Sequence, residues 1–148
     1  MGRNVHRRKG SFDSMKLVFE GFVDYGEDNK LDGTIKDQTH KGELADHAFV
    51  FISRPYRSTW IQPIACYATM RSCSGSVIQQ LMAREICALY QHGAVVKSVV
   101  CDGAQSNKLA TKLSGVTGKY GDLNNAFQNK PSSFEHPTIN NKKIFFFY

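Results

Sequence analysis

The sequence predicts a single α/β domain built on a mixed sheet, with a three-strand meander followed by alternating strands and helices. The first half of the chain carries short β-prone runs, and from residue 76 the apolar residues recur at helical intervals. The predicted order is β-β-β-α-β-α-loop-β, which passes from antiparallel connections to the crossovers that parallel strands require. The chain has 148 residues, 41% of them hydrophobic, which is enough for one core.

Three strands are predicted before the first helix. Residues 12–19 have strand composition, and residues 21–26 look like a second strand that closes at a glycine, so the two suggest a hairpin. Residues 27–43 have no apolar period and predict an exposed loop. The third strand starts with the apolar run at 48–52, and in the β-prone residues that follow Pro63 indicates an edge or a bulge.

The clearest predicted helix covers residues 76–92. Ser74 or Ser76 can cap its amino end, and Gly93 can end it as the C′ residue. The apolar residues with helical spacing are Ile78, Leu81, Met82, Ile86, Leu89 and Tyr90.

Strands and helices alternate after that helix. Residues 95–101 predict a strand, residues 106–113 a shorter helix that Gly115 stops, and residues 143–148 an apolar terminal strand. Glycines, asparagines and prolines in residues 118–137 predict a long irregular segment.

Charge and composition narrow the class of protein. The formal net charge of +6 and the pI near 9.2 favour a polyanionic partner such as DNA or RNA. We expect residues 1–10 to form a basic flexible tail ahead of a domain at 11–148. No apolar run approaches the roughly 20 residues that span a bilayer, and the amino end lacks a secretory signal, so we expect an intracellular soluble protein without membrane association. Four widely spaced cysteines and five histidines without ligand spacing argue against a structural zinc ion and against disulfides.

Two aspartates are the candidate catalytic and metal-binding residues. Asp102 follows the predicted strand at 95–101, where α/β enzymes place catalytic acids, and Asp13 interrupts a strand-like run in which aspartate is unfavourable. On neighbouring strands they can hold Mg²⁺ or Mn²⁺ for two-metal phosphoryl transfer. Two carboxylates offset about half the charge of two divalent ions, so such a site normally needs a third acid. The alternatives are an ordinary Asp-Gly turn at Asp102 and a solvent-facing aspartate on an edge strand at Asp13.

Three other features carry less specific signals. Glu85, the only acid of the predicted helix at 76–92, is interpreted as a solvated or partly paired residue. The glycine-rich stretch at 115–121 invites comparison with phosphate-binding loops but matches neither the Walker nor the dinucleotide pattern. A group of cations and aromatics suits base stacking or phosphate contact, although strand packing explains the aromatics about as well. Its members are Arg54, Tyr56, Arg57 and Trp60.

Seven segments, taken together, resemble the P-element transposase family. They occur in order and cover nearly everything after the basic tail: residues 12–15, 21–26, 44–48, 51–62, 99–107, 134–137 and 144–147. The resemblance implies an RNase H-like core with one metal-binding aspartate on the first strand and another after the fourth, which fall on Asp13 and Asp102. It also implies a nuclear protein that cleaves and joins DNA with Mg²⁺, using water or a 3′-hydroxyl as the nucleophile.

The chain also departs from that family pattern. Ser14 stands where an acid is common, and no Cys and His set matches the family's THAP-type zinc finger. The family's GTP-binding insertion and the helix with its third catalytic acid would lie beyond Tyr148, which implies a core truncated after its fifth strand. We therefore expect a transposase fragment with little or no cleavage activity of its own.

Two alternatives from other classes stay open. The first is a non-catalytic DNA-binding or assembly factor that regulates a full-length transposase through DNA or through mixed oligomers. This alternative rests on the net positive charge alone, and such a factor could also associate with a second copy of itself. The second is a small nucleotide-binding protein that uses residues 115–121.

Overall fold

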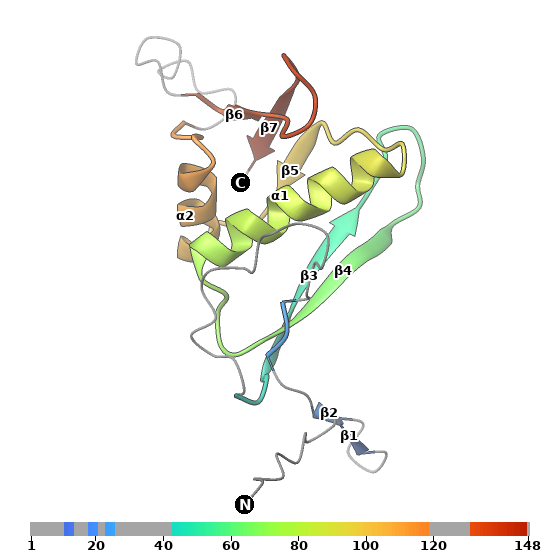
Figure 1. Ribbon diagram of the computed structural model, residues 1–148, viewed down its shortest axis with the longest axis vertical. Helices are drawn as coiled ribbons and strands as arrows, with labels where there is room; N and C mark the ends of the chain where they lie inside the picture. Colours follow the sequence, from blue (N-terminus) through green and yellow to red (C-terminus); the bar gives the residue numbers. More distant parts are fainter. Residues whose placement is uncertain (1–10, 14–17, 21–22, 26–42, 119–130, 148) are drawn as a thin grey trace, which may run out of the picture.

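A computed structural model of the chain describes residues 11–13, 18–20, 23–25, 43–118 and 131–147 (Figure 1). Its elements in chain order are β1 (Ser11–Asp13), β2 (Val18–Glu20), β3 (His47–Ser53), β4 (Gln62–Thr69), α1 (Gly75–Gln91), β5 (Ser98–Val100), α2 (Gln105–Leu113), β6 (Ser133–Glu135) and β7 (Lys143–Phe147). The mixed α/β class is confirmed. Within the described residues, no helix has the length and apolar character needed to cross a membrane.

The described strands form three small sheets instead of the one sheet that the sequence predicts. β1 pairs antiparallel with β2, and β3 pairs antiparallel with β4. In the third sheet β7 is central, parallel to β5 and antiparallel to β6. The mixed parallel and antiparallel pairing is therefore present, but two separate hairpins replace the predicted three-strand meander.

The prediction of a single strand at residues 12–19 is wrong. That segment holds both β1 and β2, which pair in the register Phe12↔Phe19. Strand composition does not locate a reversal of the chain when no glycine or proline marks it. The predicted second strand at 21–26 is described only at residues 23–25, where Asp24 forms an isolated bridge to β4.

Two further differences concern the strands around the helices. The third predicted strand is a hairpin, β3 and β4, with a break in register next to the pairing of Ile52 with Pro63, so the bulge predicted at Pro63 is confirmed. The predicted irregular segment at 118–137 contains β6, which exists through its pairing with β7.

Local signals place α1 as predicted. The side chain of Ser74 accepts a hydrogen bond from the backbone N–H of Val77 at 3.4 Å. At the other end Gly93 has a φ of 83°, and the two backbone hydrogen bonds of a Schellman motif close the helix.

The apolar face of α1 supplies residues to two core clusters. Val77, Ile78 and Leu81 belong to the cluster under β3 and β4. Met82 and Ile86 belong to the cluster that contains residues of β7. Phe51 of β3 packs against both clusters, so α1 positions the hairpin and the three-stranded sheet together.

The two helices approach each other closely at Gly75. A Cβ atom at this position would lie 2.7 Å from the Cβ of Leu109 and 2.8 Å from the carbonyl oxygen of Ser106. A side chain here would therefore push α1 and α2 apart.

Gly75→Ala should destabilise the protein. Overpacking costs about 1–3 kcal/mol, which outweighs the gain of at most about 1 kcal/mol that alanine brings to a helix. The matched control is Gly103→Ala, whose Cβ would meet only the flexible end of Lys108, at 3.8 Å. Urea unfolding of both variants measures the difference, and equal midpoints would contradict the close packing of α1 on α2.

Candidate functional site

Asp102 lies at the turn that joins β5 to α2, where its exposed carboxylate accepts two hydrogen bonds. Its Oδ1 accepts from the backbone N–H of Ala104 at 3.1 Å and from the side-chain amide of Asn107 at 2.7 Å. The residue at the N-cap position of α2, Ala104, makes no side-chain cap of its own. Asp102 therefore does hold the turn together, as the alternative interpretation predicted.

The same two bonds also suit Asp102 to a binding role. Among the described residues Oδ2 has no hydrogen-bond partner, and hydrogen bonds to the other oxygen fix the direction in which it points. The partial positive charge at the amino end of α2 favours an anion here. A fixed, exposed carboxylate oxygen is a ligand that Mg²⁺ prefers. Asn107 was not singled out in the sequence, where its position in the first turn of the predicted helix is the signal that could have identified it.

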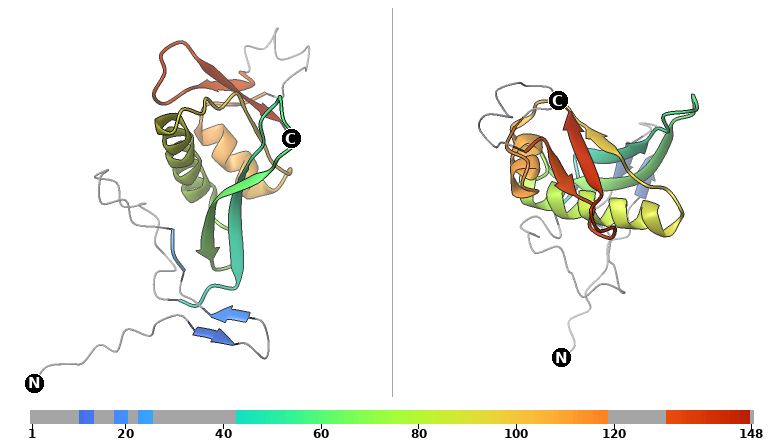
Figure 2. Two further views of the ribbon diagram at one scale, coloured as in Figure 1. Left: turned by 90° about the vertical axis from the view of Figure 1, so that its right-hand side faces the viewer. Right: turned by 90° about the horizontal axis from the view of Figure 1, so that it is seen from above.

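Asp13 lies on β1, which among the described strands pairs with β2 alone. The β1–β2 hairpin stands away from the sheet that contains β5 in Figure 1 and in the left view of Figure 2. The structure therefore does not bring Asp13 beside Asp102. In the part of the chain that the structure describes, no group of three or more His, Cys, Asp or Glu side chains could hold a metal ion. The two-aspartate metal site stays a prediction.

Glu85 belongs to a polar network between α1 and β4. Its carboxylate accepts a hydrogen bond from the Tyr67 hydroxyl and lies 3.5 Å from Nε of Arg84. The Arg84 guanidinium lies 5.0 Å from the centre of the Tyr67 ring and donates to the carbonyl of Tyr25 at 2.6 Å. Burial, and then the bond to Glu85, raise the pKa of Tyr67. Glu85 is thus paired and part-buried, and the network fastens residues 23–25 to the sheet.

The first residue of the glycine-rich stretch at 115–121 lies just after the carboxyl end of α2. Gly115 has a φ of 86°, and its N–H donates to the carbonyl of Lys112 at 3.0 Å as α2 closes. The carboxyl end of a helix carries partial negative charge, which disfavours phosphate. Residues 119–121 lie outside the described residues, and the described part gives no support to a nucleotide site.

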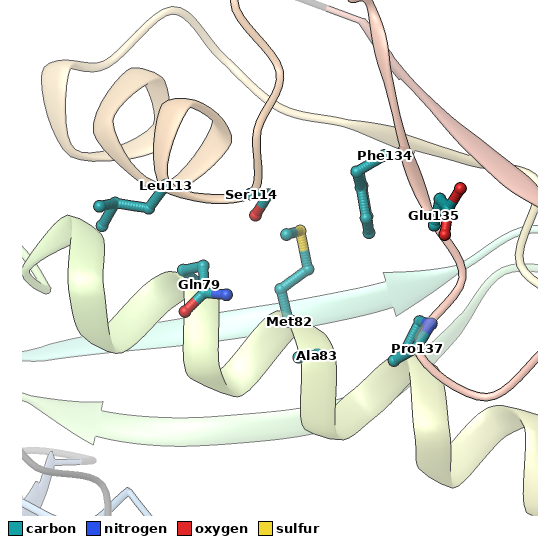
Figure 3. Close-up of a pocket in the computed structure, with 8 residues that line it drawn as sticks. All are labelled: Gln79, Met82, Ala83, Leu113, Ser114, Phe134, Glu135 and Pro137. Carbon is teal, nitrogen blue, oxygen red and sulfur yellow. The ribbon is translucent and has the colours of Figure 1, made fainter.

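A pocket of about 280 Å³ opens between α1, α2 and β6 (Figure 3). Met82, Leu113 and Phe134 provide apolar walls, and Glu135 is its one acidic residue. It lies at the carboxyl end of α2, whereas Asp102 lies at the amino end, about 13 Å away along nine helical residues. The pocket is therefore separate from the turn that holds Asp102.

His136, which follows β6, is 5% exposed. Its Nδ1 accepts a hydrogen bond from the backbone N–H of Thr138 at 3.2 Å, so in the neutral ring the proton is on Nε2. Its ring packs edge-on against the Tyr90 ring, with 5.5 Å between the ring centres. Nε2 is buried and has no hydrogen-bond partner in the described structure. Burial, and then the charge of Lys97, lower the pKa of His136.

The family described as TNP-like, RNase H N-terminal domain, matches residues 6–115, which is more than half of the chain. This match defines the class of protein as an RNase H-like, transposase-like domain. The chain belongs to the family of TNP-like RNase H N-terminal domains. Comparison with curated proteins and with solved structures found no match. The transposase-like assignment is confirmed at this level, and membership of the P-element family stays a prediction.

The turn at Asp102 should weaken when either partner of its hydrogen bonds is removed. Asp102→Ala and Asn107→Ala should each lower the free energy of unfolding by about 1 kcal/mol, the usual net value of such a bond. Asp102→Asn keeps an acceptor oxygen and should lose less. Chemical denaturation measures the three values, and a double variant that loses the full sum of the single losses would contradict a shared hydrogen bond.

His136 should make stability depend on pH. Because the pKa of His136 is lowered in the folded protein, the unfolded chain binds a proton more readily. The free energy of unfolding should therefore be unaffected by this residue above pH 6.5 and should fall as the pH decreases below that value. Unfolding measured between pH 5 and 7.5 should show a shallower slope for His136→Gln. The exposed His92→Gln is the control, and equal slopes for the wild type and His136→Gln would refute the assignment.

Proposed function

We propose that the chain is the amino-terminal part of a transposase catalytic core that cleaves and joins DNA strands. In this proposal Asp13 and Asp102 hold Mg²⁺ together with an acid supplied from outside the described residues. The observation that carries it is the carboxylate of Asp102, exposed and oriented at the end of β5 in a chain of the transposase-like family.

One edge of β5 is free to accept another strand among the described residues, which supports a position for Asp13 beside Asp102. β5 pairs with β7 along one edge, and no described strand pairs with it along the other. Val100 of β5 is 73% exposed, which leaves apolar surface uncovered at this edge. A strand added here would bury that surface and complete main-chain hydrogen bonds. If that strand is β1, Asp13 comes to lie beside the end of β5 and Asp102.

The residues of the chain have distinct tasks in this proposal. Mg²⁺, when bound, would activate the attacking oxygen and stabilise the leaving oxygen of the phosphodiester. Asp102 offers Oδ2 while Asn107 and the N–H of Ala104 hold Oδ1. The net positive charge of the chain favours approach of the DNA.

The alternative function is a non-catalytic DNA-binding or assembly factor that associates with a full-length transposase or with a second copy of itself. One observation favours it. Residues 47–84 contain four arginines and neither aspartate nor glutamate, so the segment from the start of β3 through most of α1 has a net positive charge. That charge serves DNA binding whether or not a metal site forms.

Binding of Mn²⁺ separates the two functions. We expect Asp13→Asn and Asp102→Asn each to weaken Mn²⁺ binding at least tenfold. Loss of a residue that only supports a metal ligand typically weakens metal binding about 10- to 100-fold, and loss of the ligand itself should cost at least as much. The measurement is the free Mn²⁺ signal in electron paramagnetic resonance, with the exposed Glu135→Gln as the control.

The same variants are assayed for DNA binding. Mn²⁺ affinity that is unchanged in Asp13→Asn, with DNA affinity retained in both aspartate variants, would refute the paired site and favour the binding factor.

A further inference from the structure

The loop between β3 and β4, residues 54–61, exposes two aromatic rings. Tyr56 is 77% exposed and Trp60 is 54% exposed, so strand packing does not account for them. Ile52 and Ile61 beside them are exposed as well. The loop projects from the edge of the molecule (Figure 2, right). Four exposed apolar side chains within one short segment are typical of a site of interaction.

The charge of the loop indicates what it binds. Arg54 and Arg57 are exposed, and in the described structure neither is paired with an acidic residue. The sequence contains no acid from residue 47 to residue 84. Two copies of the loop would repel each other, whereas a polyanion is complementary to it.

A hydrogen bond fixes the loop on the body of the protein. The Tyr56 hydroxyl lies 2.5 Å from the hydroxyl oxygen of Ser98, the first residue of β5. The polar end of the ring is therefore held while most of the side chain stays open to solvent, so little conformational entropy is lost when a ligand stacks on it. Ser98 and Asp102 lie at the two ends of β5, about 13 Å apart at 3.3 Å per residue. That is the length of about four stacked nucleotides.

We propose that this loop binds unpaired DNA bases a few nucleotides from the reacting phosphate. Tyr56 and Trp60 stack on the bases, and Arg54 and Arg57 bind the adjoining phosphates. Unpaired bases are required because in a duplex the faces of each base are covered by its neighbours, whereas aromatic side chains need an open face. The inference rests on the proposed function, since it takes DNA as the partner.

Trp60 is the sole tryptophan of the chain, so tryptophan fluorescence reports directly on contact between Trp60 and DNA. The full chain is titrated with a short oligothymidylate and with a duplex of the same length, and tryptophan emission and the anisotropy of labelled DNA are recorded. Emission should be quenched by the single strand and much less by the duplex. Trp60→Ala and Tyr56→Ala should each weaken single-strand binding by about 5- to 150-fold, the range for loss of one stacked base.

Matched variants separate stacking from charge. Trp60→Phe should retain most of the affinity, and Leu113→Ala, which removes an exposed apolar side chain on α2, should leave it unchanged. Arg54→Gln together with Arg57→Gln should reduce the slope of log affinity against log salt by about 1.4, the value for two phosphate contacts on a single strand. Arg71→Gln, at the opposite end of the hairpin, should not change that slope.

The outcomes also separate the loop from the proposed function. Absence of binding to either DNA would overturn both. Binding to DNA without quenching, and with equal affinity in Trp60→Ala, would overturn the stacking role alone and leave the loop as a surface for a protein partner.

Discussion

Burial of one face of α1 is the interaction on which the rest of the structure depends. Leu81 is fully buried, and Val77 and Met82 nearly so, each contributing about 1.5–3 kcal/mol relative to exposure. Because this face supplies both core clusters, it fixes the β3–β4 hairpin relative to the sheet of β5, β6 and β7. Phe51 joins the two clusters, and the bond from Tyr56 to Ser98 continues that connection to the surface. Asp102 and the aromatic loop are thus held by one framework, at opposite ends of β5.

The elements that the sequence predicts well are those that local chemistry determines. The cap at Ser74 and the left-handed residue at Gly93 both lie within one turn of the helix they bound, so short stretches of sequence contain the whole signal. Strand pairing depends on residues far apart. Nothing within β6 distinguishes it from a loop, because its partner β7 follows several residues later. Residues 12–19 have strand composition whether they extend or turn back, and only the register of β1 on β2 decides.

The same division applies to the candidate site. Asp102 was found because strand, turn and helix follow one another at that point, whereas the contribution of Asn107 requires knowing which way its side chain points. The predicted pairing of Asp13 with Asp102 depends on which strands are neighbours, and composition carries no information about that. For Trp60 the sequence left packing and recognition equally open, because exposure follows from the position of the loop on the completed fold.

The central position of β7 also has a consequence for how the protein is made. β5 ends at residue 100, but the strand to which it hydrogen-bonds ends at residue 147. At the usual 5–20 residues per second a ribosome needs roughly 2 to 9 seconds to add the intervening chain. During that interval all residues of α1 and of the β3–β4 hairpin have been made, whereas β5 has no main-chain partner. The segment that carries Asp102 therefore gains its main-chain partner only after nearly all of the described chain has been made.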